Sequence, residues 1–253
     1  MLQLVFDFHT ASVQTNRFVP TNTDFLSTMT DHALAQLETK KREEGMEALY
    51  SAVDSSLSYF GESQLREVHH FEIEVPWYLE NEKYVGNAMD IPQIVSDIGS
   101  SPNKSYPLIK VGLAVMIPQS VIDGSKSVGA IVECGHGLFL NRGMLDTTPM
   151  RRLANDNGFV VFATDLRGLS LAGLPILGKV STADASKHIV DLYMNLIQGY
   201  VNKVAAARFY VREILDRERV LLKLPVEADF DSFTTVRDIH YYMSSVYLSF
   251  YLS

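Results

Sequence analysis

The chain has 253 residues, 47% of them hydrophobic, which is enough to bury a full core in one large domain or in a small domain followed by a larger one. Its 22 Lys and Arg residues are outnumbered by 30 Asp and Glu, giving a net charge of -8. This balance argues against a surface that attracts nucleic acid or anionic lipid, so we expect no nucleic-acid partner.

The usual sequence signals for export, membrane insertion and metal binding are missing. The first residues lack the basic start and long apolar stretch of a secretory signal, and no run reaches the ~18 to 20 apolar residues that a membrane span needs. The single cysteine, Cys134, cannot form an internal disulfide or a zinc cluster. We therefore expect no membrane span and no metal, and take the compartment as unknown, cytoplasmic by default.

The first part of the chain mixes predicted strands with one helix. Apolar and polar residues alternate over residues 2–9, the period of a strand buried mainly on one face. Thr23 is placed to cap a helix that ends in the charged run 40–44. A second alternating strand is predicted over residues 71–75, where Pro76 ends it.

Residues 87–107 are rich in Pro, Gly, Ser and Asp and are predicted to form a long irregular connection. We place a domain boundary here, between residues 1–106 and 107–253. A strand is predicted over residues 108–117, and Asp123-Gly124 indicates a hairpin turn into the next strand.

Beyond this turn the pattern changes to that of an α/β fold. Residues 128–134 and 159–164 are nearly uninterrupted apolar runs, typical of strands buried on both faces. Between them, residues 144–157 are predicted to form a helix that Gly158 closes. A helix between two such strands implies a βαβ unit with a parallel sheet.

The last third of the sequence predicts one long helix and a buried strand. The helix begins near Thr182 and carries apolar residues at helical spacing as far as Ile214, with Gly199 either weakening it or marking close packing. The strand is predicted over residues 239–243.

A glycine turn directly follows the strand at residues 128–134. Acyl transfer needs backbone N–H groups aimed at the oxygen that becomes negative, and such a turn can present one. Gly135 and Gly137 would permit the turn and His136 would brace it through the backbone. The N–H of Leu138 is the predicted oxyanion donor, with Phe139 as an apolar wall.

Two segments of the sequence resemble α/β-hydrolase esterases and lipases. Residues 129–139 resemble the third strand of that family and the His-Gly-X oxyanion loop that follows it. Residues 157–170 resemble the next strand and its Asp-X-Arg-Gly turn. They match in order and spacing. Parts of the upstream sequence are more faintly similar to large bacterial-type hydrolases, which carry a β-rich domain before the catalytic domain. The resemblance implies a partial α/β-hydrolase sheet after a smaller mixed region, and a small ester as substrate with no organic cofactor. It also implies a structural role in the turn for Asp165 and Arg167.

The sequence departs from this family at the nucleophile. Family members carry Gly-X-Ser-X-Gly, which is absent here, and the acid and His come later in the chain. The register of the predicted strand at residues 239–243 puts Ser244 at the first Gly position, Val246 at the nucleophile position and Leu248 at the second Gly position. Ser244 and Ser245 remain as displaced candidate nucleophiles, and of the two we take Ser245 as the candidate. Because only Val246 to Ser253 follow, we expect an inactive or truncated copy, whose apolar edge strand would promote self-association.

Two other interpretations of the sequence stay open. Gly135-X-Gly137 after a strand, with Asp165 ending the next strand, has some features of a dinucleotide site, although Leu140 stands where the third glycine belongs. The chain could also be a non-catalytic interaction protein built on the same partial fold.

Overall fold

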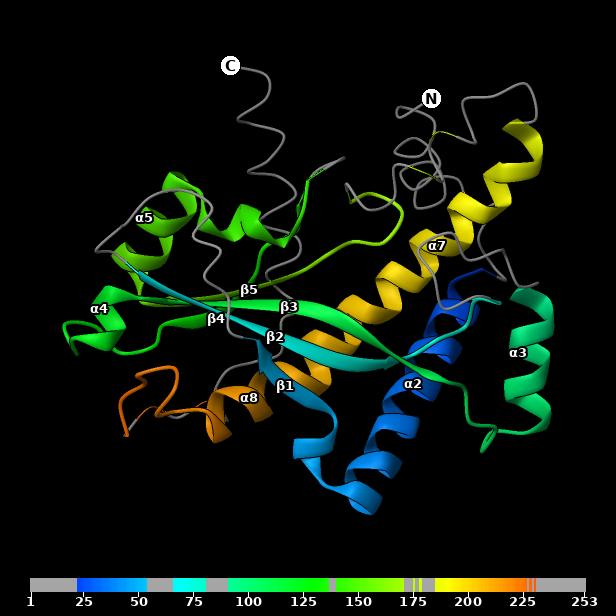
Figure 1. Ribbon diagram of the computed structural model, residues 1–253, viewed down its shortest axis with the longest axis horizontal. Coiled ribbons are helices and arrows are strands. Elements are labelled where there is room, and N and C mark those ends of the chain that lie inside the picture. Colours follow the sequence, from blue (N-terminus) through cyan, green and yellow to red (C-terminus); the bar gives the residue numbers. More distant parts are fainter. Residues whose placement is uncertain are drawn as a thin grey trace.

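The structure is a computed structural model that describes residues 22–53, 66–80, 91–136, 140–170 and 185–226, with four single positions, 175, 178, 228 and 230. The strands predicted over residues 2–9 and 239–243 lie outside the described residues. The described chain forms a five-stranded sheet with helices on both faces (Figure 1). None of the described helices has the length and apolar character needed to cross a membrane.

The sheet is mixed. Its strands, in spatial order, are β1 (Tyr50–Val53), β2 (Arg66–Pro76), β3 (Leu108–Pro118), β5 (Phe159–Thr164) and β4 (Ala130–Glu133). The pairs β1–β2, β2–β3 and β3–β5 are antiparallel, and only β4 and β5 are parallel. The α/β class is therefore confirmed, but the predicted parallel sheet is limited to one pair of strands in the described part of the chain.

The helices form two layers, one on each face of the sheet (Figure 1). Their bounds are α2 (Asn22–Glu44), α3 (Ile91–Ser100), α4 (Gln119–Ile122), α5 (Thr148–Asn157), α7 (Ala185–Ala205) and α8 (Val211–Arg217), with 3-10 turns η1 (Met46–Ala48) and η2 (Arg142–Asp146) and a π-helical segment η4 (Ala206–Tyr210). Helix α5 covers one face, and α2, α7 and α8 cover the other.

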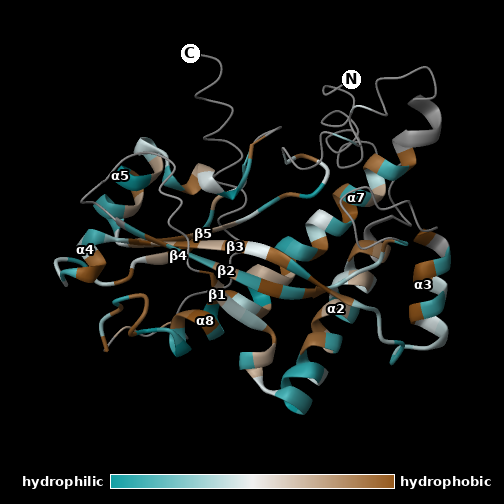
Figure 2. Ribbon diagram, in the orientation of Figure 1, coloured by the Kyte–Doolittle hydropathy of each residue, from teal (hydrophilic) through white to brown (hydrophobic). Residues whose placement is uncertain are grey.

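Each face of the sheet has its own apolar core. On the α7 face, Leu113 and Phe162 of the sheet are fully buried with Leu37 of α2. On the α5 face, Met116 and Val161 pack with Ala154. Burial on both faces explains why β3 and β5 lack alternation, and Figure 2 shows β3 apolar along much of its length.

The predicted domain boundary at residues 106/107 falls between two strands of the same sheet. Strands β2 and β3 pair over their whole length, from Arg66 opposite Pro118 to Pro76 opposite Leu108. The α7-face core draws on residues from both sides of this position. Within the described ranges, the two predicted regions thus share one sheet and the α7-face core.

The prediction of an irregular connection over residues 87–107 is wrong for its middle part, which forms helix α3. The helix presents Ile91, Ile94 and Ile98 at spacings of three and four, and Ile94 is fully buried. The many Gly, Pro and Ser residues obscured this period in the sequence. Pro92 is tolerated because it is the second residue of the helix, where its missing N–H is not needed.

The hairpin predicted at Asp123-Gly124 is also wrong. Strand β3 is followed by the short helix α4, and Gly124 then takes a left-handed backbone with φ 72°. The chain passes on to β4, which pairs with β5 and not with β3. The turn signal was real, but it marks the end of a helix and not a strand-to-strand connection.

The other local predictions agree closely with the structure. Strand β5 has the predicted bounds, and Gly158 closes α5 in the left-handed conformation with φ 68°. The predicted helix over residues 144–157 divides into η2 and α5. Helix α2 is described from Asn22, so Thr23, the predicted cap, lies within its first turn.

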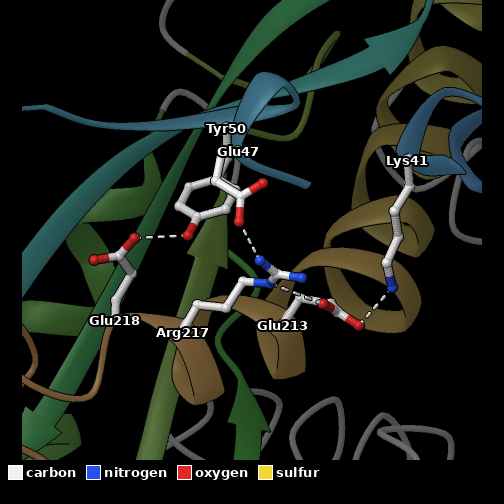
Figure 3. A network of polar contacts seen from close by, with 6 residues as sticks. All are labelled: Lys41, Glu47, Tyr50, Glu213, Arg217 and Glu218. Atoms are coloured by element: carbon white, nitrogen blue, oxygen red, sulfur yellow. Dashed lines mark hydrogen bonds and ion pairs between the residues drawn. The ribbon is translucent and has the colours of Figure 1, made fainter. Parts of the chain in front are cut away.

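A polar network fastens α8 to α2 and to the sheet edge (Figure 3). The Arg217 guanidinium pairs with Glu47 and Glu213, and Glu213 also accepts from Lys41 at 2.7 Å. The Tyr50 hydroxyl donates to Glu218 at 2.6 Å, and burial together with this carboxylate raises the tyrosine pKa. Since most of these groups are partly exposed, each pair contributes little, and the network mainly fixes where α8 ends.

A more buried ion pair joins α7 to β4. The Lys203 ammonium lies 3.3 Å from a Glu133 carboxylate oxygen, and the two side chains are 13% and 6% exposed. Burial raises the pKa of Glu133, while Lys203 acts in the opposite direction. Removing one partner of such a pair leaves a charge in a poorly solvated place.

We therefore expect Lys203→Met to lower the free energy of unfolding by about 3 to 5 kcal/mol. The double variant Glu133→Gln with Lys203→Met should recover most of this loss, because no buried charge is left behind. Urea unfolding followed by circular dichroism measures both. The exposed pair Lys110–Glu72 supplies the control, since Lys110→Met should change stability by no more than ~0.5 kcal/mol.

Candidate functional site

The carboxyl ends of β4 and β5 lie side by side at one edge of the sheet. From β4 the chain continues to α5 on one face, and from β5 it continues to α7 on the opposite face. In α/β sheets, ligands bind outside the carboxyl ends of parallel strands where the connections leave on opposite faces. We call the position between the ends of β4 and β5 the switch point in this sense. The candidate site is therefore the region between these two strand ends.

The predicted oxyanion loop begins at this switch point. The Cys134 N–H donates to the Phe162 carbonyl at 2.8 Å, so the pairing of β4 with β5 extends to the residue before Gly135. Gly135 and His136 follow directly. Gly137, Leu138 and Phe139 lie outside the described residues, so the Leu138 N–H as oxyanion donor stays a prediction.

His136 links the two strand ends. Its ring is 5% exposed, and Nε2 accepts a hydrogen bond from the Leu166 N–H at 2.7 Å. While this bond is made, Nε2 carries no proton and is engaged with the backbone. The ring thus ties the loop after β4 to the turn after β5, which is a bracing contact and not that of a general base.

Gly135 has room around it. Its φ lies outside the left-handed region, and beyond its chain neighbours no described residue has an atom within 4 Å of the position that a Cβ would take. That Gly135 permits the turn stays a prediction, because the turn continues into Gly137 to Phe139, which lie outside the described residues. Glycine at such a position leaves space for another group to approach the backbone.

Asp165 is held by Arg142, which the sequence analysis did not identify. The backbone N–H of Arg142 donates to Oδ1 at 2.8 Å, and its guanidinium pairs with Oδ2. The guanidinium lies over Gly112 of β3, where a Cβ would overlap it. Asp165 thus connects the turn after β5 to η2, and no local sequence signal indicates Arg142 as its partner.

Arg167 has different partners from Asp165. Its guanidinium stacks on the Trp77 ring at 4.4 Å, and Nε donates to the Asn195 side chain at 2.5 Å. A Cβ on Gly199 of α7 would lie 2.8 Å from the Arg167 carbonyl oxygen, so the helix packs directly on the turn. Gly199 therefore marks close packing, one of the two readings of the sequence, and Arg167 anchors the turn to α7 and to the end of β2.

Two buried hydroxyls at this edge were also missed by the sequence analysis. Thr164 ends β5 and Ser170 ends the following turn, and each is 2% exposed. Within the described ranges, neither hydroxyl oxygen has a hydrogen-bond partner. Buried hydroxyls are usually paired, so these two are free to bond a ligand or an ordered water.

The described residues hold no group of three or more His, Cys, Asp or Glu that could bind a metal ion. Cys134 is buried, and burial raises the pKa of its thiol to about 12, so it is not a reactive nucleophile. The displaced nucleophile candidate Ser245, with Ser244, lies outside the described residues.

No protein-family model, curated protein or solved structure matches this chain.

The glycines at this site allow a direct test of the packing. Gly199→Ala should lower the free energy of unfolding by about 1 to 3 kcal/mol, because its Cβ would collide with the Arg167 backbone. Gly135→Ala should change it by no more than ~0.5 kcal/mol, since its Cβ would enter open space. Urea unfolding of both variants measures these changes. Equal losses of unfolding free energy in the two variants would contradict the described geometry.

Proposed function

We propose that this chain is an α/β-hydrolase-like protein, related to carboxylic-ester hydrolases, that keeps the oxyanion loop without a competent nucleophile. Its ligand is a small ester or acid that lies at the carboxyl edge between β4 and β5. No metal or organic cofactor takes part in this proposal. The observation that carries it is the position of Gly135-His136 at the switch point, between two parallel strands whose connections leave on opposite faces.

Three features of the site support this function. The two resembling segments contain the adjacent parallel strands β4 and β5, so Gly135-His136 and the Asp-X-Arg-Gly turn lie at the same edge of the sheet. The His136 ring bonds the Leu166 N–H and braces one against the other. The space at Gly135 would allow a carbonyl group to approach the backbone.

Catalysis by acyl transfer would also need a nucleophile and a base. The sequence has no Gly-X-Ser-X-Gly, and His136 uses its Nε2 to accept from the backbone. The proposal therefore includes ligand binding without turnover.

The dinucleotide interpretation is less well supported. A pyrophosphate would sit on a helix that begins at the glycine turn, but α5 begins at Thr148, well beyond Gly135. The ribose would need Asp165, and both carboxylate oxygens of Asp165 already accept from Arg142. An interaction protein on the same fold remains the second candidate, and it predicts no small-ligand response at this edge.

Amide chemical shifts measured on the full chain test the proposal. The probe is the mono-4-nitrophenyl ester of methylphosphonic acid, a stable mimic of the tetrahedral anion formed in ester hydrolysis. We expect it to shift the Gly135 and His136 amides, because the mimic would lie against this backbone. Gly135→Ala should weaken the response at least tenfold, since its Cβ fills the space while the fold persists.

Turnover is measured separately with 4-nitrophenyl acetate, and none above background is expected. Hydrolysis that Ser245→Ala abolishes would keep the ester class but contradict the missing nucleophile. Shifts produced by NADH and not by the phosphonate would favour the dinucleotide interpretation. If neither ligand changes the amide shifts and size-exclusion chromatography gives a defined oligomer, the interaction-protein interpretation would be favoured.

A further inference from the structure

A buried histidine lies outside the candidate site, where α2 packs against the end of β2. His32 is 7% exposed, and both of its ring nitrogens have partners. Nε2 lies 2.8 Å from the Lys104 carbonyl oxygen, and Nδ1 lies 2.8 Å from the Tyr78 hydroxyl oxygen. The ring therefore connects three segments that are far apart in the sequence.

The partners determine which nitrogen carries the proton. A carbonyl oxygen only accepts, so Nε2 must donate to Lys104. In the neutral ring Nδ1 is then the acceptor, and the Tyr78 hydroxyl donates to it. The same hydroxyl oxygen also lies 3.3 Å from the Met29 carbonyl oxygen, within reach of a second acceptor. One hydroxyl hydrogen thus has two alternative acceptors, one on each side.

The surroundings of His32 are mostly neutral. The Tyr106 ring meets the imidazole edge-on at 5.4 Å, and Gln198 of α7 binds the Tyr78 N–H. The facing charges are the Lys104 ammonium, which lies 5.1 Å from the centre of the Tyr106 ring, and Asp97 of α3, which pairs with that ammonium at 2.5 Å. Burial lowers the pKa of His32, and the bond to the Lys104 carbonyl acts in the opposite direction.

We propose that His32, Tyr78 and the Met29 carbonyl form a relay that lets the core take up a proton without breaking the α2 contact. A proton from solvent binds Nδ1, which then donates to the Tyr78 oxygen. The hydroxyl turns its hydrogen to Met29, so every donor keeps an acceptor. Acidification thus changes the direction of one hydrogen bond and leaves the packing intact.

The sign of the pH dependence follows from the lowered pKa. The neutral ring favours the fold, so this contribution to stability is full above pH ~6.5 and declines as the pH falls towards the folded-state pKa. The relay limits the decline because the protonated ring still has two acceptors. Without the Tyr78 hydroxyl, the new Nδ1–H would be buried without a partner.

The decisive measurement is an NMR titration of the His32 ring in the full chain. Tyr78→Phe should lower its pKa by about one pH unit, because a hydrogen bond to a charged group is about twice as strong as a neutral one. The matched control is Tyr106→Phe, which removes a nearby hydroxyl that has no partner within the described ranges. That control should leave the His32 pKa unchanged.

An unchanged or raised His32 pKa in Tyr78→Phe would overturn the relay. If that variant fails to fold, the nitrogen-15 shifts of the His32 ring in the unaltered protein still test the relay, because they report which ring nitrogen carries the proton. We expect the neutral proton on Nε2, and a fold that persists below the His32 pKa in near-ultraviolet circular dichroism. A neutral proton on Nδ1, or unfolding that coincides with His32 protonation, would contradict the proposal.

Discussion

Helix α7 contacts the carboxyl ends of three strands, and the arrangement of the candidate site depends on these contacts. The Gln198 side chain donates to the Pro76 carbonyl and accepts from the Tyr78 N–H. It thus supplies hydrogen bonds to backbone groups at the end of β2. Gly199 lets the helix rest on the backbone of Arg167 after β5. Lys203 reaches Glu133 of β4. A shift of this one helix would therefore move all three strand ends.

Elements governed by neighbouring residues could be predicted from the sequence. The continuous apolar run of β5 and the glycine that ends α5 both depend on contacts within a few residues, and both were predicted correctly. Helix α3 was missed because its three isoleucines lie among Gly, Pro and Ser residues that favour a loop. The hairpin failed for a different reason, since strand pairing is decided across the sheet and not at the turn.

The same distinction applies to the candidate site. The sequence places Gly135, His136 and Asp165 at the ends of two buried strands, and the structure brings these ends together through parallel pairing. It could not show that Arg142 holds Asp165 or that Trp77 stacks on Arg167, because these partners come from distant parts of the chain. Nor could it show that Gly135 faces open space, which depends on what packs nearby.

The polar groups at this edge are satisfied unevenly. Where α7 covers the edge, buried amides such as Asn195 and Gln198 bond to side chains and to free backbone groups. Three buried polar atoms at the same edge, the Trp77 Nε1, the Thr164 hydroxyl and the Ser170 hydroxyl, have no partner in the described part of the chain. A buried unpaired group is costly to the fold, about 1 to 3 kcal/mol each, so a ligand or water that bonds to it gains that energy. These unpaired groups beside the β4–β5 switch point support the ligand position proposed for this edge.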